Sequence, residues 1–251
     1  MTMRIEIFLY DLSAALSEQV LLGTQADAKA PPNKINPNLM AASLLHPDDA
    51  KALSDHPERR LLQRVSRYYR RKLLATALNQ APNTLVFSQT TWGKPIILQH
   101  EQLGFNQSHT PLLYGLAWSQ DIAHLGLDIE NKNRVINQSA LAQRILTDTE
   151  YQYFLQASDP QAYLLKLWTI KEAVLKASGL GIRVNLNSLE TACESTQHNK
   201  GVAWQAQIGH WAYACYELMQ HWLCVSWPDQ PDVTDIDVDI DIDIIFSHES
   251  A

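Results

Sequence analysis

The amino-acid sequence predicts an α+β protein composed of two similar halves. A helical segment followed by short strand-like segments occurs twice, over residues 58–119 and again over residues 159–226, without an exact sequence repeat. Apolar residues recur every three or four positions in the helical segments, whereas the strand-like segments are short apolar or alternating runs. The chain has 251 residues, of which 46% are hydrophobic and 19% charged. This composition is typical of a soluble globular protein with one large domain or two small ones.

The first half begins with a strand and a long helix. Residues 4–9 alternate and include β-branched side chains, which indicates a strand. The three prolines within residues 21–38 indicate a loop. Residues 57–79 form the long helix, with Pro57 at an early helical position that tolerates proline. Its buried stripe is expected to contain Leu61, Leu62, Val65, Tyr69, Leu73, Ala77 and Leu78.

Strands follow this helix. Residues 84–98 predict a strand, a tight turn at residues 92–95 and a second strand. Residues 103–119 and residues 121–130 contain further short strands around loops.

The second half repeats this order. Three helices are expected over residues 138–144, 147–155 and 159–177, and Thr147 with Glu150 forms a capping box for the second of them. Ser178 and the glycines after it end the third helix. The closing strands are expected over residues 202–207, 211–217 and 222–226.

Composition also bears on the compartment. No run approaches the roughly 18 apolar residues that a membrane helix needs, and the N-terminal residues lack the order of a signal peptide. Cys193, Cys215 and Cys224 are odd in number and widely spaced, which favours neither a disulfide framework nor a zinc site. We therefore expect a cytoplasmic protein with reduced thiols and no membrane partner.

The net charge of −7 is unevenly distributed. Residues 229–251 contain eight acids and no Lys or Arg, so residues 1–228 carry +1. Residues 58–72 contain seven bases and one acid. The acidic segment is expected to be a solvated, mobile tail, because five aspartates on one face of an extended segment would oppose pairing in a sheet.

Three carboxylates could form a metal site. Asp128 and Glu130 are two residues apart at the end of an apolar strand, so both side chains share a face. On the helix 159–177, Glu172 and Lys176 lie one turn apart on the face that carries Trp168. Each pair alone fits a solvated strand end or an exposed helix ion pair. Together, the three acids match the oxygen ligands that Mg²⁺ prefers, with room for a phosphate.

Several cations and donors could bind phosphate. Lys94 lies in the turn Trp92-Gly93-Lys94-Pro95, and Ser108 with His109 lies between apolar segments. Arg67 and Arg71 are one turn apart on the basic helix and could hold a phosphate. The alternative for His109 is a loop or core histidine whose ring is hydrogen-bonded within the protein. The alternative for Arg67 and Arg71 is a solvated basic face of the helix.

These residues resemble the motifs of a known family. The segment GLDIE, followed after 41 residues by Glu172 in WTIKEAVLK, resembles the motif pair of the 4′-phosphopantetheinyl transferase superfamily. The upstream segments SRYYRRKLL, FSQTTWGKP and FNQSHT resemble, in order and spacing, further motifs of its two-lobed, Sfp-type branch. The resemblance covers about residues 61–182. Gln107 and Thr110 depart from the usual family residues without removing a phosphate donor.

The resemblance implies two similar lobes, each a small, mostly antiparallel sheet packed with a long helix, and coenzyme A in the cleft between them. We place an N-terminal lobe at residues 1–118, a C-terminal lobe with the catalytic motifs at residues 119–228, and the acidic tail at residues 229–251. The implied reaction transfers the phosphopantetheine arm of coenzyme A to a serine of an apo acyl or peptidyl carrier protein. It releases adenosine 3′,5′-bisphosphate.

The resemblance also implies roles for individual residues. Mg²⁺ is expected on Asp128, Glu130 and Glu172, and Glu172 is the candidate base, acting directly or through water. Lys176 is expected to neutralise charge on the leaving phosphate. The residues expected to bind coenzyme A are Arg67, Arg71, Lys94, Ser108, His109, Asp128, Lys171 and Lys176.

The family resemblance implies a monomer of two lobes that requires no nucleic acid. The alternative function is a nucleic-acid or polyanion-binding module that uses the basic helix over residues 58–72. It leaves the three carboxylates unexplained, and no nucleic-acid motif accompanies the helix. The acidic tail could also compete with an acidic carrier for this helix. The sequence does not identify the carrier protein.

Overall fold

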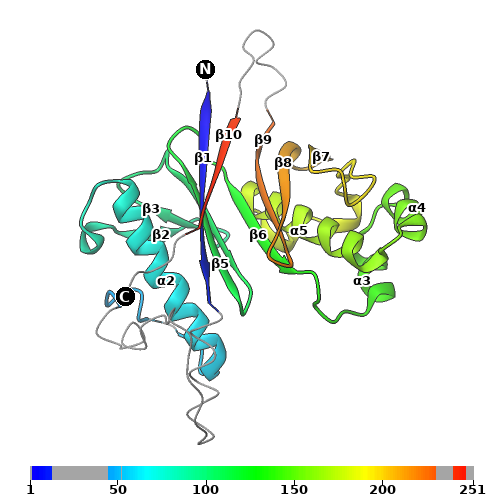
Figure 1. Ribbon diagram of the computed structural model, residues 1–251. Helices are drawn as coiled ribbons and strands as arrows, with labels where there is room; N and C mark the ends of the chain where they lie inside the picture. The colour runs from blue at the N-terminus through cyan, green and yellow to red at the C-terminus, as the bar shows by residue number, and fades with distance from the viewer. Residues whose placement is uncertain (1, 13–44, 52, 230–239, 247–251) are drawn as a thin grey trace, which may run out of the picture.

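The structure is a computed structural model that describes residues 2–12, 45–51, 53–229 and 240–246. The loop expected over residues 21–38 lies outside this part of the chain. Figure 1 shows four layers side by side, namely helix α2, a first sheet, a second sheet and a group of three helices. The helices are α2 (Pro57–Ala77), α3 (Gln138–Ile145), α4 (Asp148–Gln156) and α5 (Pro160–Ser178), with short 3₁₀ turns at Pro82–Thr84, Gly181–Arg183 and Leu186–Ser188.

The first sheet has the strand order β10-β1-β5-β4. The strands are β1 (Met3–Asp11), β4 (Gly104–His109), β5 (Leu113–Ser119) and β10 (Ile240–Phe246). The pairs β1–β5 and β4–β5 are antiparallel, and β10 is parallel to β1. A separate hairpin of β2 (Phe87–Gln89) and β3 (Pro95–Ile97) encloses the predicted turn. Helix α2 covers the outer face of this sheet, and we call this unit the first lobe.

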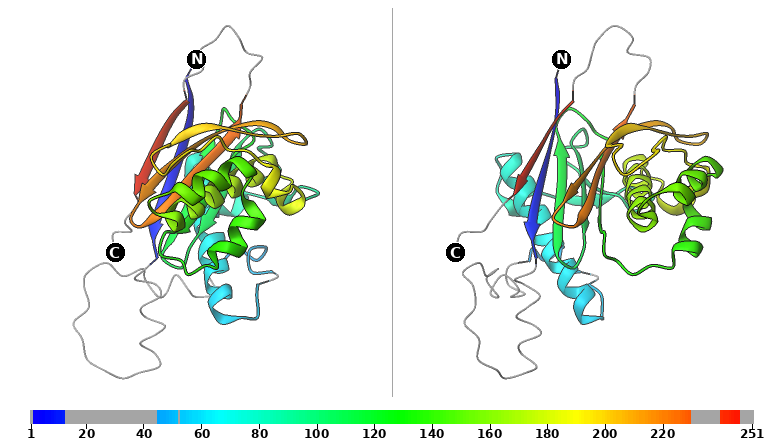
Figure 2. Two further views of the ribbon diagram at one scale, coloured as in Figure 1. Left: turned by 90° about the vertical axis from the view of Figure 1, so that its right-hand side faces the viewer. Right: turned by 45° about the vertical axis from the view of Figure 1, so that its right-hand side comes forward.

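The second sheet has the order β6-β9-β8-β7, and all its pairs are antiparallel. The strands are β6 (Gly126–Asn131), β7 (Lys200–Gln205), β8 (Gly209–Leu218) and β9 (His221–Pro228). Figure 2 shows α3, α4 and α5 on the outer face of this sheet, and we call this unit the second lobe. The capping box of Thr147 and Glu150 at the start of α4 is confirmed, as is the glycine after α5, since Gly179 has a φ of 73°.

The predicted α+β fold is confirmed by this arrangement. The two sheets face each other across a shared apolar core, to which β1 contributes Ile5, Ile7 and Leu9 and the second sheet contributes residues such as Leu127 and Leu223. All five of these side chains are fully buried. Because this core lies between the sheets, the two lobes form one packed body. No helix in the described part of the chain is long and apolar enough to span a membrane.

The prediction of a mobile tail is wrong for residues 240–246, which form strand β10 beside β1 (Figure 1). The alternating sequence gives this strand two different faces. Ile240, Ile242 and Ile244 pack against the core between the sheets, and the aspartates lie on the other face. Residues 230–239 and 247–251 of the predicted tail lie outside the described residues.

Charge repulsion does not prevent this pairing, because the neighbours of the aspartates include a cation. Arg4 of β1 lies opposite Asp241 in the register. Its guanidinium donates from Nη2 to Asp243 Oδ2 at 2.6 Å and also lies 3.3 Å from Glu6 Oε1. Repulsion among the aspartates alone therefore does not determine the conformation of this segment, because the strand that pairs with it supplies a compensating cation.

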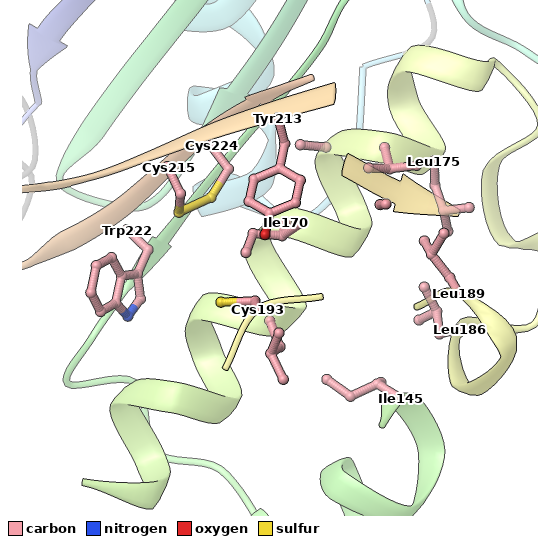
Figure 3. Close-up of a cluster of buried hydrophobic side chains, with 14 of the residues drawn as sticks. Ile145, Ile170, Leu175, Leu186, Leu189, Cys193, Tyr213, Cys215, Trp222 and Cys224 are labelled. Carbon is pink, nitrogen blue, oxygen red and sulfur yellow. A yellow bond between two sulfur atoms is a disulfide. The ribbon is translucent and has the colours of Figure 1, made fainter. Parts of the chain in front are cut away.

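The cysteine prediction is also wrong. Cys215 of β8 and Cys224 of β9 are directly opposite each other in the sheet and form a disulfide. Figure 3 shows this disulfide in the core of the second lobe, near Tyr213 and Trp222, with Cys193 as a separate buried thiol. Cys215 and Cys224 are equally far from the hairpin turn at Met219 and Gln220, so the register that this turn sets places them opposite each other.

The packing of β10 predicts which of its isoleucines stabilise the fold. Ile242→Ala removes side-chain atoms that pack against the inter-sheet core, so it should lower the free energy of unfolding by about 1 kcal/mol. Ile245→Ala on the opposite face is the matched control and should lower the free energy of unfolding by less. The two values come from urea unfolding followed by circular dichroism. Equal effects of the two substitutions would contradict the assigned faces of β10.

Candidate functional site

The site is centred on Asp128, a buried carboxylate where the two lobes meet. Its Oδ1 accepts hydrogen bonds from Ser108 Oγ of β4 at 3.0 Å and from Lys176 Nζ of α5 at 2.7 Å. Lys176 also donates to the Leu127 carbonyl at 3.0 Å and to Ser108 Oγ at 3.1 Å. This group therefore joins β4 of the first lobe to β6 and α5 of the second lobe.

The second oxygen of Asp128 is buried and has no hydrogen-bond partner among the described residues. A buried carboxylate oxygen without a partner is energetically costly, because water solvates it in the unfolded chain. Such an atom is a physical indication of a cation or donor that the protein binds from outside.

A close backbone approach brings α5 to this carboxylate. A Cβ atom on Gly126 of β6 would lie 1.8 Å from the Ala173 carbonyl oxygen of α5, so only glycine fits there. Ala173 directly follows Glu172 in the sequence. The contact therefore sets α5 against the start of β6, two residues before Asp128.

Glu130 lies further along the same strand and is held by two donors. Its Oε1 accepts from Trp168 Nε1 of α5 at 2.9 Å and from Arg134 Nη1 at 2.7 Å. The pKa of Glu130 is raised, first by desolvation and then by the nearby Asp128, although Arg134 and Trp168 act in the opposite direction. Trp168 is only half-buried, and this bond to Glu130 accounts for its position on the polar face of α5.

The charges near Glu130 also act on Glu172. Its pKa is raised first by desolvation and then by Asp128, with a further contribution from Glu130, whereas Lys176 acts in the opposite direction. The three predicted carboxylates are thus near enough to influence one another. Within the described residues, however, no three acidic, His or Cys side chains are gathered into a ready-made metal site.

An open pocket of about 560 Å³ adjoins Asp128 and Glu130. One side consists of residues 108–112, at the end of β4 and the turn after it, and includes His109. The other side consists of residues 128–131, 133 and 134, at the end of β6 and the loop after it. Partial desolvation and the charge of Lys176 lower the pKa of His109, which favours a neutral ring. Both lobes therefore contribute to this pocket.

Two residues beside the pocket, Arg134 and His221, were not among the predicted site residues. Arg134 lines the pocket and pairs with Glu130 four residues earlier, a spacing that was visible in the sequence. Thr110 Oγ1 lies 3.2 Å from His221 Nε2 of β9, which links the lobes beside the pocket. His221 is far from Thr110 in the sequence, so no local pattern indicated this contact.

The prediction that Lys171 binds coenzyme A is wrong. Its ammonium is fully buried on the opposite side of α5, where it pairs with Glu150 Oε2 at 2.5 Å. It also donates to the carbonyls of Ile145 at 2.6 Å and Leu186 at 3.0 Å. The residue next to Glu172 therefore stabilises the interior of the second lobe, because adjacent residues on a helix face different directions.

The prediction for Arg71 is wrong for a similar reason. Its buried guanidinium pairs with Asp49 Oδ2 at 2.5 Å and donates to the carbonyls of Pro82 and Leu85. Arg70 pairs with the other oxygen of Asp49 at 2.7 Å. The prediction for Arg71 did not account for the segment 45–51, which folds back onto α2.

Two further cations of the basic helix are also used internally. Arg67 Nη1 donates to the carbonyls of Asp49 at 2.7 Å and Lys51 at 2.5 Å, and it does not line the pocket. Arg60 donates to the carbonyls of Ser54 and Asp55. The nucleic-acid alternative is not favoured, because several cations of the basic helix hold the loop before α2.

Lys94 lies at a contact between the lobes and does not line the pocket. Its ammonium donates to the carbonyls of Leu125 at 2.9 Å, just before β6, and of Ala177 at 3.1 Å, in the last turn of α5. A cation at the C-terminal end of a helix satisfies carbonyls that have no partner within the helix. Trp92 of the same turn lies over the guanidinium of Arg183, 4.1 Å from ring centroid to Cζ. The predicted WGKP turn thus holds the end of α5.

Comparison with known proteins shows which family the chain resembles. Residues 124–226 match the model of the 4′-phosphopantetheinyl transferase superfamily. The chain is 30% identical over 172 residues to 4′-phosphopantetheinyl transferase HetI of Nostoc sp., covering 64% of this chain and 70% of HetI. It is 34% identical over 106 residues to 4′-phosphopantetheinyl transferase psf-1 of Bacillus pumilus, covering 41% of this chain and 44% of that protein. It is 37% identical over 86 residues to holo-acyl-carrier-protein synthase of Vibrio atlanticus, covering 32% of this chain and 68% of that protein.

A solved structure is also similar in part. The holo-acyl-carrier-protein synthase of Thermotoga maritima superposes with a TM-score of 0.36 at 23% identity, over 42% of this chain and 62% of that chain. The structure described above has two lobes, with a pocket at their junction. The chain belongs to the 4′-phosphopantetheinyl transferase superfamily, and it is an enzyme of that class.

The buried position of Lys94 predicts a pH effect on stability. Desolvation lowers its pKa from 10.5 to about 8 in the folded protein. Between these values the unfolded chain binds more protons than the folded chain, so the Lys94 contribution to stability increases as the pH rises. The free energy of unfolding of the wild type should therefore increase relative to that of Lys94→Met between about pH 7 and pH 9.5.

This difference comes from urea unfolding at a series of pH values. Lys200→Met, at an exposed position, is the matched control and should follow the wild type across the range. A wild-type advantage over Lys94→Met that is independent of pH would contradict the desolvation of this ammonium.

Proposed function

We propose that this enzyme transfers the 4′-phosphopantetheine group of coenzyme A to a serine of an apo acyl or peptidyl carrier protein, in a reaction that depends on Mg²⁺. The observation that carries the proposal is Asp128, a buried carboxylate with one unpartnered oxygen beside Lys176 at the edge of a pocket between the lobes. The similarity to a holo-acyl-carrier-protein synthase, whose name specifies an acyl carrier protein, supports the choice of carrier proteins as acceptors.

The residues present fit a magnesium ion. Mg²⁺ binds carboxylate oxygens and prefers to retain water and substrate phosphates as further ligands. Asp128, Glu130 and Glu172 would hold it, and the unpartnered Oδ2 of Asp128 supports this assignment. When bound, the ion would supply electrostatic neutralisation of the pyrophosphate of coenzyme A.

The chemical step is a phosphoryl-type substitution. A bond forms between the serine Oγ of the carrier and the phosphorus that bears the pantetheine arm. The bond from that phosphorus to the bridging oxygen breaks, and adenosine 3′,5′-bisphosphate leaves with this oxygen. Glu172 would accept the serine proton, directly or through a water molecule. Lys176 would stabilise the negative charge on the leaving phosphate.

Ser108 and His109 are the remaining candidates for binding the nucleotide from the first lobe. Both line the pocket, and Ser108 already contacts Lys176. In the proposed complex, Ser108 Oγ and His109 would face the phosphates while Lys94 keeps α5 in place. A monomer suffices for this arrangement, since one chain supplies both sides of the pocket. The cytoplasmic location stays a prediction.

A transfer assay with Glu172→Gln tests the function. Wild-type enzyme with coenzyme A and Mg²⁺ should add one phosphopantetheine to the serine of at least one carrier in a panel of apo acyl and peptidyl carriers. Glu172→Gln should lower the rate by about 100-fold or more, because it removes both a metal ligand and the candidate base. Intact-protein mass spectrometry measures the mass gain of the carrier.

Two controls accompany this assay. Glu194→Gln, at an exposed position in the second lobe, should keep the wild-type rate. Circular dichroism should show that Glu172→Gln is folded. Failure of the wild type to modify any carrier would contradict the proposed function, and a fully active Glu172→Gln would exclude Glu172 from both roles.

A further inference from the structure

Trp168 is placed in a way that hydrophobic packing alone does not explain. It lies on α5 one turn before Glu172, on the same face as Lys176, and remains half-buried. One part of its ring packs against the core cluster of the second lobe. Its indole N–H donates to Glu130 Oε1 at 2.9 Å. The indole of Trp168 thus bonds to a carboxylate of the site, whereas the indoles of Trp211 and Trp222 bond to backbone carbonyls.

The bond connects the helix that carries Glu172 to the strand that carries Asp128. Trp168 and Glu130 are 38 residues apart in the sequence. Asp128 and Glu130 are two residues apart on β6, and their side chains share one face. The indole therefore fixes the orientation of Glu130 relative to α5, and with it the relation of Glu130 to both other carboxylates.

The two donors to Glu130 differ in kind. Arg134 carries a positive charge, its side chain is half-exposed, and it lies on the loop after β6. An incoming cation would compete with this guanidinium for the carboxylate. The indole N–H is neutral and donates in one direction, so it holds the same oxygen without competing by charge. It is suited to keep Glu130 in place when the charge beside it changes.

We infer that Trp168 is a positioning residue that orients Glu130 for binding a divalent cation. This inference rests on the proposed function, because it assumes that Glu130 is a metal ligand. Groups that hydrogen-bond to a metal-ligating carboxylate orient it, and removing one of them weakens metal binding by about 10–100-fold.

Trp168→Phe tests this inference, since it keeps the aromatic ring and removes the N–H donor. The readout is the affinity of the protein for Mn²⁺ in the presence of coenzyme A, measured by electron paramagnetic resonance of free Mn²⁺. The dissociation constant for Mn²⁺ should increase about tenfold. Trp211→Phe is the matched control, because it removes an indole bond to the Ile208 carbonyl at 2.9 Å in the same lobe. It should bind Mn²⁺ as the wild type does.

A double-mutant cycle separates positioning from a structural role. Glu130→Gln removes a ligand charge and should weaken Mn²⁺ binding by itself. If Trp168 acts through Glu130, adding Trp168→Phe to Glu130→Gln should cause little further loss. A further tenfold loss would show that Trp168 acts by another route and would overturn the inference, as would an unchanged Mn²⁺ affinity of Trp168→Phe.

The same titrations distinguish the inference from the proposed function. A wild type that binds no Mn²⁺ with coenzyme A present would overturn the proposed metal site, and the inference with it. A wild type that binds Mn²⁺, together with a Trp168→Phe variant that binds it equally well, would overturn the inference alone. Thermal unfolding of each variant checks that the proteins compared are folded, and Trp168→Met, which also removes the indole N–H, replaces Trp168→Phe if that variant is unstable.

Discussion

The position of the Asp128 carboxylate is the constraint on which the site depends. Its Oδ1 accepts from Ser108 of the first lobe and from Lys176 of α5, while Asp128 itself belongs to β6. Three elements that are distant in the sequence therefore share one buried charge. Breaking such a pair by removing one partner costs far more than its net contribution to stability, because the other charge is then left buried. The opposed sheets and the close contact at Gly126 allow this arrangement.

The charges of the chain act mainly through internal pairs. Arg70 and Arg71 share Asp49, and Lys171 pairs with Glu150 inside the second lobe. These buried pairs stabilise the fold. Their cations are therefore not available to bind phosphate, although a count of charges would include them. The pocket keeps Asp128, Glu130 and Arg134 among its lining residues, and Lys176 is hydrogen-bonded to Asp128 beside it. Local pairing, rather than the overall charge of −7, therefore determines which ligand the site can accept.

The sequence was sufficient to predict the long helices and the class of the fold, because helical periodicity and caps such as Thr147 with Glu150 are local signals. It was also sufficient to propose Asp128, Glu130, Glu172 and Lys176 as one group. It failed where the outcome depends on which strands are neighbours. The pairing of β10 with β1 joins segments that are distant in the sequence, and the disulfide follows from the hairpin register that the turn between β8 and β9 sets. The predictions that Lys171 and Arg71 bind coenzyme A failed because the residues with which they pair are distant in the sequence.

The proposed mechanism depends on Asp128 as the buried end of a divalent cation site at the junction of the lobes. A crystal of the wild-type protein grown with coenzyme A and Mn²⁺ tests it most directly, through the anomalous difference map at the manganese edge. We expect one strong peak beside Asp128 Oδ2, with Glu130 or Glu172 as a further ligand. Density for coenzyme A in the pocket with no anomalous peak beside Asp128 would contradict it.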